Sequence, residues 1–437
     1  MRFSHQTISQ TLIGTKEKDL LSYINHLNVV AQKGGYDFLE SFINLPFDEE
    51  LLRDVEKLKS KKVSPKLKYI INIGIGGSSL GAKAIYDALY GHFDVLEPNR
   101  FPKMIFLDTV DPEFLNNLLI FLKKKVSNPE EILVLLISKS GTNTEPLANF
   151  EIIYPTLKNK FININSRIVA ITGHKSKLWD QAQEKGIEMI SLPKLVGGRY
   201  SVFSAVGLFP LASAGIDIKS LVAGAQKVRA LCLSGKLEEN PAAASAFLLF
   251  HNFKNGKTIN DNFVFHPELE SLGKWYRQLM GESIGKEKDV DDNIVNIGIT
   301  PTVSIGSTDL HSVGQLYLGG PKDKFTTFIY TKYSSKKSRA PQGLFLSGLV
   351  DNISGKSASD IMDAILEGVK IAYSKRGLPF VEVVLESISE KSLGEFLQYK
   401  MMEMIFLGKL MDVNPFDQPN VESYKVETKR ILASQNK

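Results

Sequence analysis

The sequence predicts an α/β fold: two doubly wound parallel-sheet modules, with helical segments at the N- and C-terminal ends of the chain. Short, unbroken apolar runs of strand length alternate with longer helical patterns over most of the 437 residues. Two of these runs end abruptly in glycine and hydroxyl residues, which is typical of strand-to-helix turns at a sheet edge. The alternation occurs on both sides of Gly197-Gly198, which indicates two modules of similar plan.

We expect the chain to divide into a helical N-terminal segment (1–65), a first module (66–196), a second module (197–411) and a C-terminal segment with a helical tail (412–437). The predicted strands of the first module are Tyr69–Ile73, Met104–Leu107, Ile132–Ile137, Ile168–Ile171 and Glu188–Ser191. Those of the second module are Thr258–Asn262, Thr302–Ile305, Phe325–Tyr330 and Phe380–Leu385. Helices are predicted at Phe203–Ala214, Ile218–Leu233, Leu272–Met280 and Leu393–Met411.

The first informative turn follows the apolar run Tyr69–Ile73. Gly76 and Gly77 let the backbone come close to a ligand, and Ser78 and Ser79 add hydroxyl donors before a helical pattern begins. A helix N-terminus presents unpaired N–H groups, which favour an anion. The pattern predicts a phosphate cradle, with a ligand-free glycine-rich turn as the alternative. It lacks the Lys of a P-loop, and Ser79 replaces the third glycine of the dinucleotide fingerprint.

A second turn of the same kind follows the apolar run Ile132–Ile137. It brings together four hydroxyls, one amide and one cation, in Ser138, Lys139, Ser140, Thr142, Asn143 and Thr144. Such residues can merely cap a helix, and Glu145 can close a capping box with Thr142. Capping needs one hydroxyl rather than four, so oxyanion binding is favoured. Because neighbouring parallel strands share one crevice at their carboxyl ends, we expect both turns to converge on one phosphate.

The composition bounds the partners of the protein. Hydrophobic content of 43% and charged content of 23% are ordinary for a globular protein. The net charge is only +5, and the basic runs lack interleaved aromatic residues, so no nucleic-acid partner is expected. No apolar run is long enough to span a membrane, so no membrane partner is expected.

The cellular location and the absence of a metal are also expectations. The first residues lack the apolar stretch of a signal peptide, and the single cysteine, Cys232, suits a reducing compartment, so we expect a cytoplasmic protein. There is neither a cysteine cluster nor a His-Glu-x-x-His motif, so no metal site is expected.

Beyond these patterns, the chain resembles a known family. The two turns are similar to those of the sugar isomerase (SIS) domain, a doubly wound module that binds phosphosugars. The segments Val196–Ser201, Gln278–Lys286 and Phe416–Lys425 narrow the resemblance to the glucose-6-phosphate isomerase family. The resemblance extends from about residue 66 to residue 425. It implies two SIS domains, interconversion of glucose 6-phosphate and fructose 6-phosphate through a cis-enediolate, and no cofactor.

The resemblance makes Glu282 the base that moves the proton and Arg199 the cation that stabilises the enediolate. From the residues alone, Glu282 is a carboxylate at a helix end between Gly281 and Gly285, and a solvated carboxylate is the alternative. Arg199 follows two glycines that let a turn aim its guanidinium at an oxyanion, and an interdomain salt bridge is the alternative.

The resemblance assigns opening of the sugar ring to His311 and Lys425. In the family, the matching histidine completes the site of the neighbouring subunit, which implies a homodimer. His311 lies just after a predicted strand, as the two hydroxyl-rich turns do. The alternative is a structural histidine that caps a helix or is partly buried. A solvated lysine is the alternative for Lys425.

Substrate contacts are expected from Gly77, Ser78, Ser138, Lys139, Ser140, Thr142, Asn143, Gln278 and Gln418. Two positions depart from the family pattern: Asn143 stands where Thr is usual, and Asn420 stands where Gly is usual. Asn tolerates a left-handed backbone, so we expect the turn at Asn420 to survive.

Two other functions are compatible with these modules. One is a dual isomerase that also takes mannose 6-phosphate, which differs by the stereochemistry of one hydroxyl. The other is a non-catalytic phosphosugar sensor. The presence of Glu282, Arg199, His311 and Lys425, and the lack of an added DNA-binding helix pair, speak against a sensor.

Overall fold

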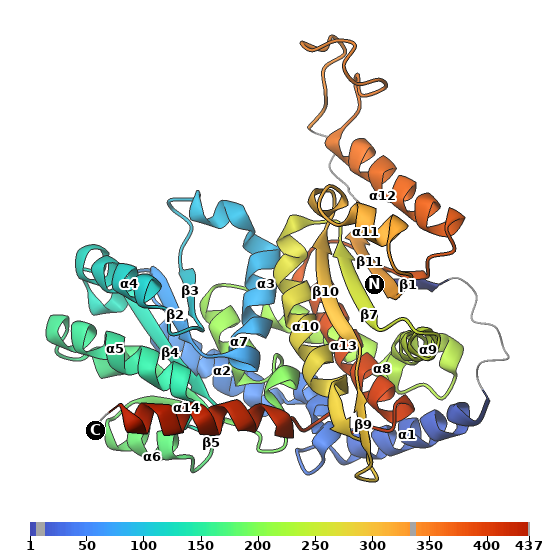
Figure 1. The fold of residues 1–437 in the computed structure, drawn as a ribbon. Coiled ribbons are helices and arrows are strands. Elements are labelled where there is room, and N and C mark those ends of the chain that lie inside the picture. Colours follow the sequence, from blue (N-terminus) through green and yellow to red (C-terminus); the bar gives the residue numbers. More distant parts are fainter. Residues whose placement is uncertain (6–13, 333–337, 436–437) are drawn as a thin grey trace.

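The computed structural model describes residues 1–5, 14–332 and 338–435 and contains two five-stranded sheets flanked by helices (Figure 1). A two-stranded ribbon of β8 (Lys286–Lys288) and β9 (Ile294–Ile297) accompanies them. The predicted α/β class with two doubly wound modules is confirmed.

The first sheet is parallel throughout. Its strands, in spatial order, are β3 (Lys103–Leu107), β2 (Tyr69–Ile73), β4 (Ile132–Ser138), β5 (Ile168–Gly173) and β6 (Glu188–Leu192). Successive residues face opposite cores, so Ile70 packs on one face and Ile71 on the other. The strand order reverses between β2 and β4, which is where open α/β sheets bind ligands.

Helices cover both faces of this sheet. The Ile71 face packs under α4 (Pro112–Lys125), α5 (Thr144–Lys160) and α6 (Lys177–Glu184). The Ile70 face packs under α2 (Glu49–Lys62), α3 (Leu80–Tyr90) and α7 (Ala205–Ser213). Burial on both sides explains why the strands are unbroken apolar runs rather than alternating ones.

The second sheet repeats the strand order of the first. Its strands, in spatial order, are β1 (Arg2–His5), β12 (Phe380–Leu385), β11 (Lys324–Thr331), β7 (Ile259–Val264) and β10 (Thr300–Ile305). The parallel strands β7, β10, β11 and β12 occupy the places that β2, β3, β4 and β5 occupy in the first sheet. The two modules therefore share one topology, as their similar sequence plan indicates.

Strand β1 corrects one expectation. The sequence predicts that the segment 1–65 is helical, but Arg2–His5 pairs antiparallel with β12 and makes the second sheet mixed. The free edge of β12 supplies the partner that these four residues need. Residues 6–13 lie outside the described residues, and α1 (Gly14–Lys33), the 3₁₀ segment η2 (Leu39–Phe47) and α2 account for most of the rest.

A group of helices packs between the second sheet and the rest of the molecule: α8 (Ile218–Cys232), α9 (Pro241–Lys254), α10 (Glu270–Ile284) and α13 (Glu390–Leu410). The other face of the sheet is covered by α11 (Gly314–Gly319) and α12 (Ala358–Lys375). Helix α13 is buried on nearly all sides, and Gly224 and Gly394 let α8 and α13 touch through their backbones. This packing fixes the point from which residues 412–418 leave the core.

Helix α13 also carries a fully buried ion pair. Both Lys400 and Glu403 are 0% exposed, and the Lys400 ammonium lies 2.9 and 3.1 Å from the two carboxylate oxygens. The Tyr276 hydroxyl donates to Glu403 at 3.0 Å, and the Ser245 hydroxyl also donates to it. Since a buried charge is costly without such partners, this pair depends on all of them.

Candidate active site

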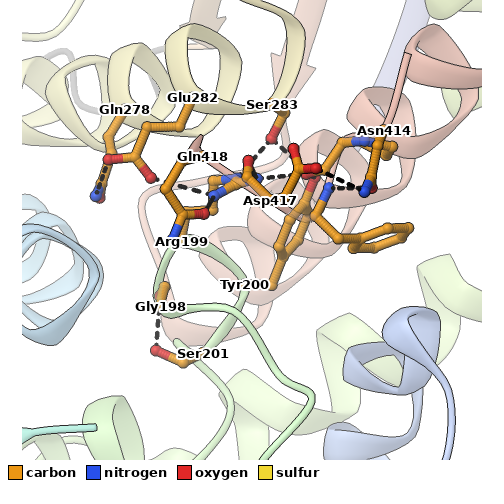
Figure 2. Close-up of polar contacts among 12 residues, drawn as sticks. Gly198, Arg199, Tyr200, Ser201, Gln278, Glu282, Ser283, Asn414, Asp417 and Gln418 are labelled. Atoms are coloured by element: carbon orange, nitrogen blue, oxygen red, sulfur yellow. Dashed lines mark hydrogen bonds and ion pairs between the residues drawn. The ribbon is translucent and has the colours of Figure 1, made fainter. Parts of the chain in front are cut away.

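Polar side chains gather where three segments meet: the turn η7 (Gly198–Tyr200), the C-terminal end of α10, and residues 414–418 after α13 (Figure 2). The turn η7 and helix α10 belong to the second module, and residues 414–418 belong to the C-terminal segment. The first module's turn η3 (Gly76–Ser78) packs against two of them. The site is therefore assembled by tertiary structure from parts that are distant in sequence.

Arg199 is the centre of this cluster. It is 2% exposed, and its Nε donates to the Ser283 hydroxyl at 2.8 Å. One terminal nitrogen donates to the backbone oxygens of Pro415 at 2.5 Å and Asp417 at 3.0 Å. The other donates to side-chain oxygens of Glu282 at 3.2 Å and Gln418 at 2.8 Å. All five N–H donors of a guanidinium are thus engaged.

These contacts divide the guanidinium into two sides. The Ser283 and backbone contacts hold Arg199 in place from the protein interior. The terminal nitrogen bonded to Glu282 and Gln418 is the side that a ligand can reach, because the Glu282 side chain is 33% exposed. A fixed, permanently charged group at such a position suits an oxyanion.

Glu282 is held at both of its carboxylate oxygens. Its Oε2 accepts from Arg199, and its Oε1 accepts from the amide of Gln278 at 3.0 Å (Figure 2). Gln278 lies one helical turn earlier on α10, as its spacing predicts. The arrangement places a carboxylate beside a cation and an amide, a combination that can move a proton next to a developing oxyanion.

Two glycines bring the first module's turn onto this cluster. A Cβ on Gly77 would lie 2.1 Å from the carbonyl carbon and oxygen of Gly198 and 2.7 Å from the nitrogen of Arg199. Gly76 has a positive φ of 57°, and a Cβ there would lie 2.7 Å from the Gln278 amide nitrogen. The two glycines allow close approach of the η7 backbone to Gly77 and of the Gln278 side chain to Gly76, and their approach to a ligand stays a prediction.

The second turn does not act as a helix cap. Helix α5 begins at Thr144, and its N-cap residue, Asn143, makes no capping side-chain bond, so the capping box of Thr142 and Glu145 is not formed. Instead, the hydroxyls of Ser138 and Ser140 donate to Asn143 Oδ1 at 2.7 and 3.2 Å. The alternative of simple capping is therefore wrong for this turn.

The remaining residues of the two turns lie around the same edge. Strands β2 and β4 are neighbours, so their turns are adjacent, as predicted. Lys139 donates to the backbone oxygen of Val196 at 2.8 Å, which ties the second turn to the glycines before Arg199, and burial lowers the pKa of Lys139. Ser79 is buried with no hydrogen-bond partner for its hydroxyl, whereas Ser78 is partly exposed.

Sequence reasoning did not single out the residues that support Arg199. Ser283 is fully buried and also contacts the Tyr200 hydroxyl at 2.9 Å. Lys286 is 7% exposed and donates to the backbone oxygen of Asp417 at 2.5 Å and to its carboxylate at 2.8 Å. Both residues belong to the motif that contains Glu282, so their proximity in sequence was the available signal.

Lys425 is the fourth residue of the C-terminal helix α14 (Glu422–Ser434). Its ammonium lies 2.7 Å from Glu422, and its side chain is 35% exposed. The hydrogen bond with Glu422 raises the pKa of Lys425, and the charge of Glu282 adds a smaller upward contribution. Lys425 is thus charged and partly open to solvent, and the structure shows it bonded to Glu422 rather than to Arg199 or Glu282.

The structure does not bring His311 to this cluster within one chain. His311 is exposed and follows the turn η10 (Thr308–Leu310) after β10. Strand β10 packs on the N-terminal part of α10, where a Cβ on Gly273 would meet the Val303 side chain at 2.6 Å. Glu282 lies nine residues further along α10, about 13 Å along the helix axis.

The turn at Asn420 forms as expected, as the 3₁₀ turn η11 (Pro419–Val421), although without a left-handed backbone at Asn420, whose amide donates to Glu287 at 2.7 Å. Among the described residues, no group of three or more His, Cys, Asp or Glu side chains could hold a metal ion. No helix within the described ranges is long and apolar enough to cross a membrane.

Comparisons with known proteins show the family of the chain. The family model described as phosphoglucose isomerase matches residues 54–437. A glucose-6-phosphate isomerase of Methanocaldococcus jannaschii is 34% identical over 403 residues, covering 91% of this chain and 94% of that protein. One from Carboxydothermus hydrogenoformans is 32% identical over 425 residues, covering 96% and 89%.

Solved structures give the same result for the fold. A hypothetical protein from Thermus thermophilus matches with a TM-score of 0.85 and 29% identity, covering 99% of this chain and 100% of that chain. A glucose-6-phosphate isomerase from Chlamydia trachomatis matches with a TM-score of 0.79 and 23% identity, covering 100% and 89%, which supports the fold alone. The chain belongs to the phosphoglucose isomerase family.

Proposed function

We propose that the protein interconverts glucose 6-phosphate and fructose 6-phosphate by ring opening and proton transfer through a cis-enediolate. The observation that carries this proposal is the contact of the Glu282 carboxylate with the Arg199 guanidinium, beside two hydroxyl-rich turns. An aldose–ketose isomerase needs a base near the carbon that loses its proton and a cation near the oxyanion that forms. Family membership supports the same reaction.

In this proposal the two turns hold the phosphate. Ser78, Ser138, Ser140 and Thr142 supply hydroxyls, with Gly77, Lys139 and Asn143 beside them. Their support is the position of both turns at the reversal of strand order between β2 and β4. The Ser138 and Ser140 hydroxyls each donate their single proton to Asn143 Oδ1, so both must turn from Asn143 toward the phosphate when it binds.

Glu282 then takes the proton from carbon 2 of the open aldose and returns it to carbon 1. Arg199 stabilises the enediolate that forms between the two transfers, and Gln278 and Gln418 contact the sugar. Since every N–H of Arg199 has a partner within the protein, the substrate oxygens must replace Glu282 or Gln418 at the terminal nitrogen that contacts both. No redox step is needed, because the proton moves between adjacent carbons.

Ring opening is assigned to His311 and Lys425, and this step requires a homodimer. His311 is exposed and follows β10, which packs on the N-terminal part of α10 away from Glu282, so in this proposal a second copy of the chain supplies it. An isolated subunit would lack the ring-opening histidine. We also propose a cytoplasmic location, for which the single cysteine, buried in α8, is the support.

The test is turnover of fructose 6-phosphate to glucose 6-phosphate by the purified full-length chain, followed with a glucose-6-phosphate-specific coupled assay. The proposal predicts turnover that needs no added metal or cofactor. A protein that binds fructose 6-phosphate without converting it would be a sensor, contrary to the proposal. Parallel assay of mannose 6-phosphate distinguishes a dual isomerase from one restricted to the glucose and fructose phosphates.

A further inference from the structure

Lys286 is a buried cation at the start of β8, two residues after the end of α10 and four residues after Glu282. Its ammonium meets Asp417 twice, at the backbone oxygen and at the carboxylate. Burial lowers the pKa of Lys286, and the bond with Asp417 opposes that effect. An ammonium group in such a place is costly unless it is well paired, so its position calls for a reason.

The turn after α13 does not need Lys286 for its own shape. Asn414 closes the turn by donating to the Asp417 carboxylate at 2.9 Å and accepting from the Phe416 N–H at 3.0 Å. Lys286 adds a different connection, because it joins Asp417 to the start of β8, which directly follows α10, the helix that carries Glu282. Two segments that are more than one hundred residues apart in sequence are thereby held together at the site.

The backbone oxygen of Asp417 is shared by two cations. It accepts from Lys286 and also from Arg199, at 3.0 Å. The next residue is Gln418, whose side-chain oxygen accepts from the ligand-facing nitrogen of Arg199 at 2.8 Å. A shift of the Asp417 carbonyl would therefore move a backbone partner of Arg199 and, with it, the neighbouring Gln418 side chain.

We propose that Lys286 is a positioning residue for the isomerisation: by holding Asp417, it sets the placement of Arg199 and Gln418 relative to Glu282. This role rests on the proposed function, since it concerns the geometry of that reaction. Lys286 itself touches neither substrate nor the reacting atoms. Misplacement of catalytic groups by about 1 Å costs up to ~10²-fold in rate, so the effect should appear in kcat.

The experiment compares Lys286→Met with Lys288→Met in the full-length protein. Lys288 lies in the same strand, β8, but its side chain is 52% exposed and pairs only with Asp292 among the described residues. We expect Lys286→Met to lower kcat at least ~10-fold with KM changed less than ~3-fold. Lys286→Arg should recover most of the rate, and Lys288→Met should match the wild type.

Combination with Gln418→Ala tests the route of the effect. If Lys286 acts through Asp417 and its neighbour, the double variant should lose little more than the worse single variant. The positioning role would be overturned if the fold-loss of kcat in the double variant equalled the product of the two single losses. It would also be overturned if the kcat of Lys286→Met lay within ~2-fold of the wild type. If Lys286→Met does not fold, Asp417→Asn replaces it, and a wild-type kcat in that variant would also overturn the role. An inactive wild type would instead contradict the proposed function.

Discussion

Replacement of Gly77 by alanine should push the turn η3 away from the turn η7, which carries Arg199. Gly77 has an ordinary backbone conformation, so alanine causes no strain of its own there. The obstacle is contact: the new Cβ would lie 2.1 Å from the carbonyl group of Gly198 and 2.7 Å from the nitrogen of Arg199. Both neighbours are backbone atoms, which cannot rotate aside as a side-chain end can.

The size of the effect follows from these distances. An ordinary contact begins near 3.4 Å, so η7 and η3 must separate by about 1.3 Å. Overpacking of this kind costs about 1–3 kcal/mol of folding stability. The larger effect should be on rate, because η7 carries Arg199 and a displacement of about 1 Å costs ~10²-fold.

The assay is steady-state turnover of fructose 6-phosphate, with thermal unfolding measured on the same samples. Gly235→Ala is the matched control, since Gly235 is also outside a helix and has no positive φ, and a Cβ added there would have nothing within 4 Å. We expect Gly77→Ala to remain folded at the assay temperature with kcat reduced ~10²-fold. A kcat within ~3-fold of the wild type would refute the close-approach argument.

Three further predictions concern binding and stability. Asn143→Ala should raise KM for fructose 6-phosphate about tenfold in steady-state kinetics, with little change in kcat. The reason is that Asn143 belongs to the turn proposed to hold the phosphate, and the phosphate is bound equally in the ground state and the transition state. A second prediction concerns Asp94. Burial acts to raise the pKa of Asp94, but the hydrogen bond from Arg100 holds this pKa below its usual value. The ionised Asp94 carboxylate therefore stabilises the fold at a pH above ~3.9, the pKa of Asp in the unfolded chain. This stabilisation is lost as the pH falls through the lower pKa that Asp94 has in the folded protein. Urea unfolding should show Asp94→Asn about 1–2 kcal/mol less stable at pH 7, with a smaller difference at pH 4. Glu403→Gln should cost about 3–5 kcal/mol in the same measurement, because it leaves Lys400 buried without its counter-charge, and an unchanged stability would contradict this.

The sequence predicts the sheet cores well because they are dominated by local signals. Strands Tyr69–Ile73 and Phe380–Leu385 are predicted to the residue, since buried parallel strands are predominantly apolar and each of these carries a single polar residue. The edge strand Arg2–His5 is missed because its pairing depends on β12, a partner about 380 residues away that leaves no local pattern. The hairpin of β8 and β9 is missed because its residues are largely exposed and lack periodicity.

The candidate site divides in the same way. The glycines of the first turn and the Arg199 motif are visible in sequence because backbone approach restricts the residues that fit. The partners that hold Arg199 are not visible, because the oxygens of Pro415 and Asp417 belong to the backbone, which every residue has. The distance of His311 from Glu282 also depends on packing of β10 against α10 and has no signal in the motif around either residue.

The most direct test of the account is the rate of fructose 6-phosphate turnover by the wild type and by Glu282→Gln, with incorporation of solvent deuterium into the product. Glutamine keeps the shape of the side chain and can still meet Gln278 and Arg199, but it cannot accept the proton. We expect kcat to fall at least ~10²-fold with the fold intact, and deuterium exchange at the reacting carbon to be lost in parallel. Turnover of Glu282→Gln within ~3-fold of the wild type, with undiminished exchange, would contradict the assignment of the base.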